Sequence, residues 1–212
     1  MSPRRADPRT AAALVEAAAE LLAAEGPPAL STRRLAAMVG ASTSAVYTHF
    51  GGMDGLVRAV VHEGFSRLHD RLALVAPTED PVTDLILLAH AYRATAQQHP
   101  HLYAVMYGTA AVDGFSPNDD DRQLARYTLS CLVSAVRRAM AARRLRHADP
   151  HLVARQLWIT LHGLVTLELG RYLADPHDAG TCHDAQLRTF LLGAGDRAEE
   201  IERSLATAHR RP

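Results

Sequence analysis

The sequence predicts an all-α protein of about nine to ten helices, with a small N-terminal head followed by a larger helical body. Apolar residues recur at intervals of three and four, which is the spacing of a helix face. An acid or hydroxyl residue precedes each apolar stripe, and glycine or proline follows it, as at helix ends. No segment shows the alternation of a strand series. Stripes before Phe50 are short and later ones are long, so we place the head at residues 1–52 and the body at 53–212.

The head is expected to contain three helices. Asp7 followed by Pro8 is a helix-start signal, and the stripe that follows stops at Gly26. Ser31 or Thr32 then caps a short second helix that ends at Gly40, because glycine adopts the left-handed backbone at little cost. Ser42 caps a third helix over 43–49.

The body opens with a long helix that begins at Asp54. Six more are expected, at about 81–98, 102–109, 122–145, 151–173, 183–192 and 196–208, with a polar loop at 113–121. The helix at 151–173 is apolar on nearly every side, which is typical of a helix packed between two partners.

Composition excludes several classes of protein. Lys+Arg and Asp+Glu both number 23, and the chain contains no lysine, so a strongly basic tail is absent. Two cysteines are too few for a disulfide scaffold and favour a reducing compartment. The most apolar stretch, Leu157 to Leu169, is shorter than the roughly 20 residues of a membrane span, and the charged start is not a secretory signal. We therefore expect a cytoplasmic protein.

One segment stands out from the balanced charge. From Pro28 to Phe50 there are two arginines and no acid. The same segment has the spacing of a helix-turn-helix, with Gly40-Ala41-Ser42 as the turn. Such a unit lays one helix across the DNA backbone and inserts the second into the major groove by its N-terminal residues. The positive charge of this segment and its helix-turn-helix spacing both indicate a DNA-binding head.

Hydrogen-bonding side chains occupy the positions that would face DNA. Threonine, serine and tyrosine hydroxyls suit base edges and phosphates, and helix N-termini bind phosphate. Val39, Val46 and Phe50 supply the apolar contacts that hold the two helices together. The expected DNA-binding residues are Thr32, Arg33, Ser42, Thr43, Ser44, Tyr47, Thr48 and His49.

The head resembles the TetR family of bacterial transcriptional regulators. The resemblance runs from Ala11 to Val61, which reads AAALVEAAAELLAAEGPPALSTRRLAAMVGASTSAVYTHFGGMDGLVRAVV. It implies that Thr43, Ser44, Tyr47 and His49 meet DNA and that Thr32 and Arg33 anchor phosphates. It also implies a homodimer that binds a palindromic or pseudo-palindromic operator, and a body that dimerises and senses a small molecule.

One departure from the family pattern concerns a lysine that relatives usually carry just after the phenylalanine. Here Phe50 is followed by Gly51, Gly52 and Met53, so that positive charge is missing. Each lost phosphate contact lowers the slope of log affinity against log salt by about 0.9. We expect a shallow salt dependence, which a lysine at Gly52 would steepen. Arg4, Arg5 and Arg9 are the alternative source of phosphate contacts.

The body resembles a TetR subgroup that carries a Trp-His-Gly triplet, although here Leu161 stands before His162-Gly163 and Trp158 lies one turn earlier. Self-complementary helices would form a two-fold four-helix interface and set two heads about 34–36 Å apart. The expected dimer residues are Leu164, Leu167, Glu168, Leu187, Phe190 and Leu191. An effector pocket, largely apolar with a few polar groups, is expected at Phe65, Tyr92, Tyr103, Met106, Trp158 and His162.

The resulting hypothesis is a ligand-responsive repressor that is neither an enzyme nor dependent on a cofactor. Two alternatives remain: a constitutive DNA-binding regulator without an effector, and a metal- or haem-responsive regulator. Twelve histidines suggest the latter, but the pairs His62/His69 and His99/His101 have no acid or cysteine at ligand spacing. His62-Glu63 begins like a zinc-protease motif, but Ser66 stands where its second histidine belongs. The sequence therefore assigns no metal ligands.

Overall fold

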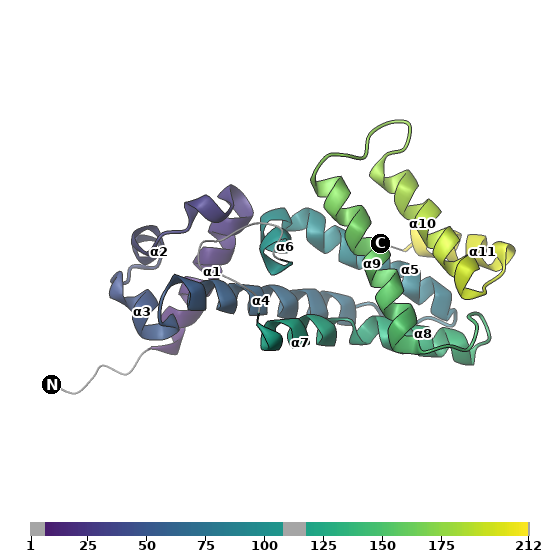
Figure 1. Cartoon of the computed structure of the whole chain (residues 1–212), viewed down its shortest axis with the longest axis horizontal. Coiled ribbons are helices and arrows are strands. Elements are labelled where there is room, and N and C mark those ends of the chain that lie inside the picture. The colour runs from purple at the N-terminus through teal and green to yellow at the C-terminus, as the bar shows by residue number, and fades with distance from the viewer. Residues whose placement is uncertain (1–6, 108–117, 212) are drawn as a thin grey trace. The chain divides into compact units, whose positions relative to one another are not determined.

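The computed structural model of the chain describes residues 7–107 and 118–211, and this part is helical throughout (Figure 1). It confirms the all-α class, with eleven α-helices and one short 3-10 helix where about nine to ten helices were predicted. Their bounds are α1 Pro8–Glu25, η1 Pro27–Ala29, α2 Thr32–Val39, α3 Ser44–Phe50, α4 Met53–Ala73, α5 Pro81–Gln98, α6 Pro100–Met106, α7 Asp119–Thr128, α8 Ser130–Ala141, α9 Pro150–Leu169, α10 Ala179–Ala194 and α11 Ala198–His209. Within the described ranges no helix combines the length and apolar character that a membrane span requires.

The described residues form two compact units. Unit 1 takes those within 1–67 and 99–125, and unit 2 takes those within 68–98 and 126–212. Helices α4 and α7 each continue from one unit into the other. A boundary at residue 52 between a DNA-binding and an effector domain stays a prediction, because compactness alone does not say which residues carry which function.

Unit 1 is built on α1, which contacts α2, α3 and α6. The predicted start is confirmed: the side chain of Asp7 accepts a hydrogen bond from the Arg9 N–H at 3.0 Å, and Pro8 is the first helical residue. Leu14, Ala18 and Leu22 are fully buried on one face of the helix. Apolar spacing in the sequence therefore identified the core face of the head.

A buried carboxylate fastens α4 to the start of α7 within unit 1. Asp121 is 1% exposed and accepts hydrogen bonds from the Asn118 N–H at 2.8 Å and from Arg58, and its other oxygen lies 2.6 Å from His62 Nε2. Although burial raises the pKa of Asp121, these bonds hold it below its ordinary value. His62 therefore has a carboxylate partner that its place in the sequence did not indicate.

Unit 2 surrounds α5, which contacts α8, α9 and α11. Residues 81–86 are all buried, so α5 rather than α9 is the helix enclosed on most sides. Arg144, in the loop after α8, contacts both Asp80 and Asp196 at 2.6–2.8 Å and so joins the start of α5 to the loop before α11. A network of charges thus closes one end of the unit.

Two predicted helices differ from the structure. The single helix predicted at 122–145 is two helices that begin at Asp119, because a 3-10 type turn, Leu129 N–H to Arg126 O at 3.2 Å, separates α7 from α8. Three of the four residues around this turn, Tyr127, Thr128 and Ser130, are weaker helix formers than alanine or leucine. By contrast, α10 runs through Gly193 and ends at Gly195, whose φ of 110° suits glycine alone. Packing against α9 and α11 outweighs the propensity cost of Gly193.

Candidate nucleic-acid interface

The α2–α3 segment forms a helix-turn-helix with the predicted caps at α2. Ser31 Oγ accepts a hydrogen bond from the Arg34 N–H at 3.2 Å. Gly40 adopts the left-handed conformation (φ 65°, ψ 29°), and the Ala41 N–H reaches back to the Ala36 oxygen at 2.9 Å. This closure turns the chain sharply between the two helices. The prediction for the next cap was wrong: Thr43, not Ser42, precedes the first residue of α3.

Helix α3 divides into a buried face and an exposed face. Val46 is fully buried, and α3 contacts both α1 and α2. The neighbouring Tyr47 is 63% exposed, and Thr43, Ser44 and Thr48 are exposed with it. A short helix anchored by one valine therefore presents a row of hydroxyl groups to solvent, as major-groove recognition requires.

Hydrogen bonds within α3 orient some of these hydroxyls. Ser42 Oγ and Ser44 Oγ lie 2.7 Å apart, and Thr48 Oγ1 donates to the Ser44 carbonyl at 2.9 Å. The Thr48 oxygen therefore remains an acceptor. Thr43 makes no side-chain capping bond, and His49 is half-buried with its ring 6.1 Å from that of Phe50. Thr43 and Tyr47 have the greatest freedom to meet base edges.

The two arginines of α2 are not equivalent. Arg34 forms two hydrogen bonds to Glu25 at the end of α1, and this pairing lowers the pKa of Glu25. Arg33 is exposed and takes part in none of the ion pairs of the described residues. Thr32, the first residue of α2, is half-buried beside it. Arg33 is thus the arginine available to a phosphate.

Glycines fix the junction between α3 and α4. Gly51 and Gly52 have φ angles of 74° and 147°, which disfavour any other residue. A Cβ on Gly55 would lie 1.9 Å from the Phe50 oxygen, so α4 starts against the end of α3. The test with a lysine at Gly52 needs correction, because a side chain there would be strained. Met53 is the first residue after the two glycines with an ordinary backbone.

Several features of this head were missed from the sequence. Glu25 was not recognised as the partner of Arg34 because it lies nine residues earlier, on another helix. Apart from the glycine itself, nothing in the sequence indicated that Gly55 lies close to the Phe50 oxygen. Of the basic N-terminal residues, Arg9 is exposed, whereas Arg4 and Arg5 lie outside the described residues.

The six predicted pocket residues fall into two groups, one in each unit. In unit 1, Tyr107 meets the Phe65 ring edge to face at 5.5 Å between centroids and lies tilted against the Tyr103 ring at 4.8 Å, and Met106 is buried beneath Gly64. In unit 2, Trp158 Nε1 donates to the Tyr92 hydroxyl at 3.2 Å, and that hydroxyl lies 3.5 Å from His162 Nδ1. Burial lowers the pKa of His162. The assignment of all six to one pocket stays a prediction.

The predicted dimer residues also divide by burial. Leu164, Leu187 and Leu191 are at most 2% exposed and form part of the protomer core. Glu168 accepts hydrogen bonds from Arg93 at 2.6 and 2.7 Å, which lower its pKa. Leu167 is 46% exposed and Phe190 is half-buried. Those two alone of the six present apolar surface to a partner.

Other apolar side chains of α9 and α10 are more exposed than the predicted ones. They are Leu152, Ile159 and Leu192, with exposures of 54%, 57% and 48%. A groove of about 800 Å³ lies between these helices, and its lining includes Leu152, Ile159, Thr160, Phe190 and Gly193. The hydrophobic stripe therefore did not indicate which turns of α9 and α10 face outward, and the place of the dimer interface stays a prediction.

Comparisons with known proteins agree with this architecture. Residues 14–60 match the bacterial regulatory proteins of the tetR family, and residues 85–190 match a tetracyclin repressor-like C-terminal domain. The HTH-type transcriptional regulator Rv1816 of Mycobacterium tuberculosis is 26% identical, over 85% of this chain and 90% of its own.

Solved structures show the same fold. A protein of unknown function from Rhodococcus sp. RHA1 is 27% identical with a TM-score of 0.76, over 92% of this chain and all of its own. RolR in complex with resorcinol is 15% identical with a TM-score of 0.69, over 96% of this chain and 95% of its own. With its helix-turn-helix head and matching C-terminal domain, the chain belongs to the TetR family of DNA-binding transcriptional regulators.

Proposed function

We propose that this chain is a homodimeric repressor that binds a palindromic or pseudo-palindromic operator and is released from it by a small, largely apolar effector. The observation that carries the proposal is the exposed row of Thr43, Ser44 and Tyr47 on α3, backed by the buried Val46. Short hydroxyl side chains at the start of a recognition helix suit base-edge contacts. Arg33 and the N-terminus of α2 supply the contacts to phosphate.

Selection of bound sequences from random duplexes tests the DNA-binding part. We expect enrichment of a two-fold symmetric consensus, because two identical heads read two half-sites. The double variant Thr43→Ala/Tyr47→Ala should abolish enrichment while the dimer persists. Tyr172→Ala is the matched control, because Tyr172 is 78% exposed in unit 2, outside the motif. Recovery of no consensus by the native chain would refute the proposal.

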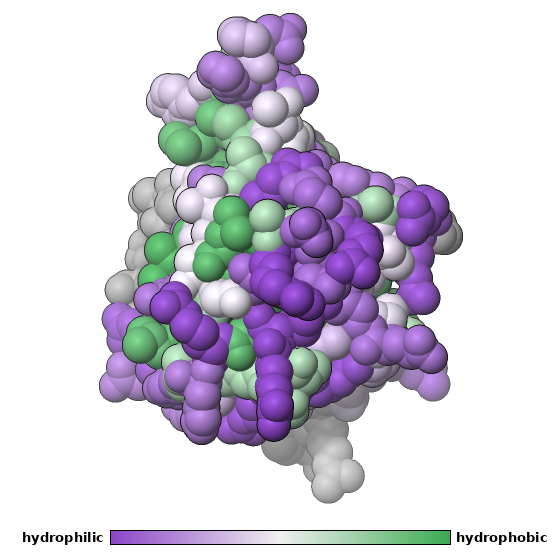
Figure 2. Space-filling view, turned by 90° about the vertical axis from the view of Figure 1, so that its right-hand side faces the viewer, coloured by the Kyte–Doolittle hydropathy of each residue, from purple (hydrophilic) through white to green (hydrophobic). Residues whose placement is uncertain are grey.

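The α9–α10 surface supports the dimer. Figure 2 shows one end of unit 2, with hydrophobic side chains on one side of the view next to a broad hydrophilic area. Exposed Ile159, Leu167 and Leu192 lie on these two helices. Gly163 is exposed, and no atom lies within 4 Å of a Cβ added there, so the surface is open at its middle. An apolar helix pair with small residues suits a two-fold interface.

The bonded group of Tyr92, Trp158 and His162 supports the effector part. It combines aromatic surface with three polar tips, which is the usual character of a small-molecule site. Trp158 is the only tryptophan, so its fluorescence reports directly on this group. Resorcinol, the ligand of the similarly folded RolR, is the first probe, followed by a panel of small phenols and apolar acids.

Saturable fluorescence quenching by one probe, together with release of the selected duplex, would support an effector at this group. Effector action requires different affinities for the DNA-competent and DNA-incompetent states. His162→Ala should weaken such a probe without changing DNA affinity in its absence. Duplex binding that no member of the panel changes would favour the constitutive regulator instead.

A further inference from the structure

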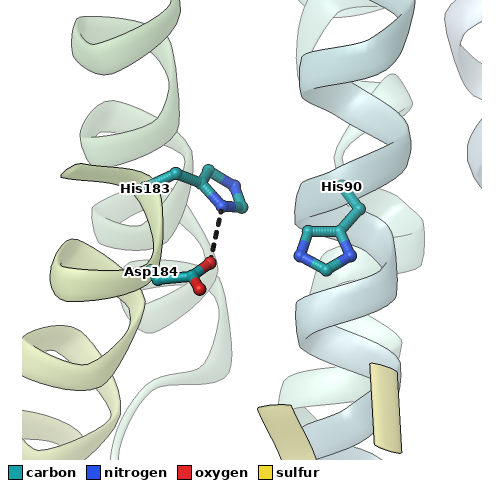
Figure 3. Close-up of side chains that lie close together, drawn as sticks. All are labelled: His90, His183 and Asp184. Atoms are coloured by element: carbon teal, nitrogen blue, oxygen red, sulfur yellow. Dashed lines mark ion pairs between the residues drawn. The ribbon is translucent and has the colours of Figure 1, made fainter. Parts of the chain in front are cut away.

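Three histidines and a carboxylate gather in unit 2, away from the motifs considered above. His183 and Asp184 are consecutive on α10, His90 lies on α5, and His209 ends α11. Figure 3 shows the rings of His90 and His183 facing one another from two helices, with Asp184 beside His183. The His90 and His183 ring centroids lie 5.3 Å apart, and the His90 and His209 rings are stacked at 5.4 Å and 13°.

The deepest member of this cluster has an unused ring nitrogen. His183 is 1% exposed, and its Nε2 has no hydrogen-bond partner among the described residues. An unsatisfied buried polar atom costs about 1–3 kcal/mol, so a buried polar atom usually has a partner, which can be a water or an ion. On the other side of the ring, Nδ1 lies 3.7 Å from Asp184 Oδ1, which is too long for a hydrogen bond. The His183 imidazole is therefore held in place by burial rather than by hydrogen bonds.

The spacing of the donor atoms suits a small cation. One ligand atom from each of His90, His183 and Asp184 lies within 4.8 Å of the other two. Around a tetrahedral zinc ion, with bonds of about 2.0–2.2 Å, ligand atoms are roughly 3.4 Å apart. A modest rotation of half-buried His90 would close the difference. His209 Nε2 lies 3.5 Å from Asp184 Oδ2, next to this set of three, and its ring would have to move toward the other two donors to serve as a fourth ligand.

Burial and neighbouring charges act on both imidazoles of the cluster. Burial, together with the nearby His90 and Arg93, lowers the pKa of His183 to about 4. Burial, with His209 beside it, lowers the pKa of His90 too. Arg93, the neighbouring cation, is held by two hydrogen bonds to Glu168.

Solvent reaches the cluster from one side. A groove of about 410 Å³ in unit 2 is lined by His90 together with Arg71, Leu87, Ala91 and Arg211. His90 therefore belongs both to this open groove and to the cluster that contains buried His183. An ion entering by the groove would meet His90 first.

We propose that His90, His183 and Asp184, with His209 as the fourth ligand, bind a divalent transition metal ion, and that Zn²⁺ fits this set best. Two or three imidazoles and one carboxylate are typical zinc ligands, whereas Mg²⁺ and Ca²⁺ prefer oxygen ligands alone. This site is independent of the function proposed above, because metal binding can be measured without DNA or effector.

Calorimetric titration of the untagged, chelator-treated full chain tests the site. We expect one equivalent of Zn²⁺ per chain, no detectable Mg²⁺ binding, and a rise of Tm with Zn²⁺. Co²⁺ in place of zinc should give the visible absorption of a tetrahedral site. His90→Ala and Asp184→Asn should each weaken Zn²⁺ binding at least tenfold. His147→Ala, which removes an exposed histidine of the same unit, is the matched control.

Either of two results would overturn the proposal: the absence of stoichiometric Zn²⁺ binding, or binding that survives unchanged in both His90→Ala and Asp184→Asn. His183→Ala is a less direct test, because its buried side chain also supports folding. The test therefore relies on the variants of His90 and Asp184, which are only half-buried. Their variants should keep the native helical circular dichroism, which separates loss of the site from loss of the fold.

Discussion

At the scale of single residues, adjacent arginines on α2 have different surroundings. Arg33 is exposed and takes part in no ion pair of the described residues, whereas Arg34 is paired with Glu25. We expect Arg33→Ala to weaken operator binding and to lower the salt slope by about 0.9, the contribution of one phosphate contact. Arg34→Ala should change DNA affinity much less. Fluorescence anisotropy over a salt series measures both, and equal effects of the two substitutions would contradict the assignment.

The absence of lysine after Phe50 gives a second prediction at this scale. Met53→Lys should restore one phosphate contact and steepen the salt slope by about 0.9. Met53 is preferred to Gly52, whose φ of 147° would strain a side chain. Leu74→Lys is the control, because Leu74 is 74% exposed in unit 2 and adds the same charge away from the motif. A slope that Met53→Lys leaves unaltered would show that backbone N–H groups already serve this phosphate.

At the scale of elements, a buried hydroxyl joins α11 to the start of α5. Ser204 is 1% exposed and donates to Asp80, which also accepts from the Thr83 hydroxyl at 2.7 Å. Burial raises the pKa of Asp80, but hydrogen bonds from Ser204, Thr83 and the Val82 N–H, together with Arg144, hold it below its ordinary value. Because the folded-state pKa is depressed, this stabilisation is present above the unfolded value and is lost as pH falls below about 4.

Removal of this hydroxyl should therefore alter both stability and acid unfolding. We expect Ser204→Ala to lower the free energy of unfolding at pH 7 by about 1 kcal/mol and to move the acid unfolding midpoint to higher pH. Circular dichroism during urea and pH titrations provides the measurement. Thr207→Ala removes a hydroxyl that bonds only to Arg203 and Arg210 among the described residues and not to Asp80, so this variant should leave the acid midpoint in place. A shift of equal size in both variants would disprove the role of Asp80.

The limits of sequence reasoning also appear at the scale of elements. Local sequence signals predicted a helix end correctly where a capping residue or a glycine bonds to residues next to it in the chain, as at Asp7, Ser31 and Gly40. Local signals failed where contacts with other helices determine the length of a helix, as at Gly193, which remains helical inside α10. The predicted DNA-facing residues belong to one short motif, so they could be proposed from spacing alone. The His90–His183 pair lies 93 residues apart, so only the fold brings it together.

At the scale of the whole chain, equal numbers of acids and bases conceal a local arrangement. Several arginines are matched by carboxylates in place, as in the Arg58–Asp121, Arg93–Glu168 and Arg144–Asp196 pairs. These pairs neutralise much of the positive charge inside each unit. Arg33, which lies in the acid-free segment, is left outside such pairs. A neutral protein can thus bind a polyanion through a small positive surface.

The proposed dimerisation is the property of the whole molecule on which the proposed reading of a symmetric operator depends. We expect Gly163→Trp to weaken dimerisation at least tenfold, because two-fold symmetry places the added indole in the interface twice. The protomer itself should tolerate the change, since no atom lies within 4 Å of a Cβ at this exposed site and tryptophan is a better helix former than glycine. Light scattering over a concentration series measures the association.

Ala206→Trp, at an exposed position of α11, is the control and should remain dimeric. The two heads of a dimer share one binding event, so a monomeric Gly163→Trp chain should also lose most of its affinity for the symmetric duplex while retaining its helical content. A Gly163→Trp chain that stays dimeric and binds with native affinity would place the two-fold interface elsewhere than on the α9–α10 surface.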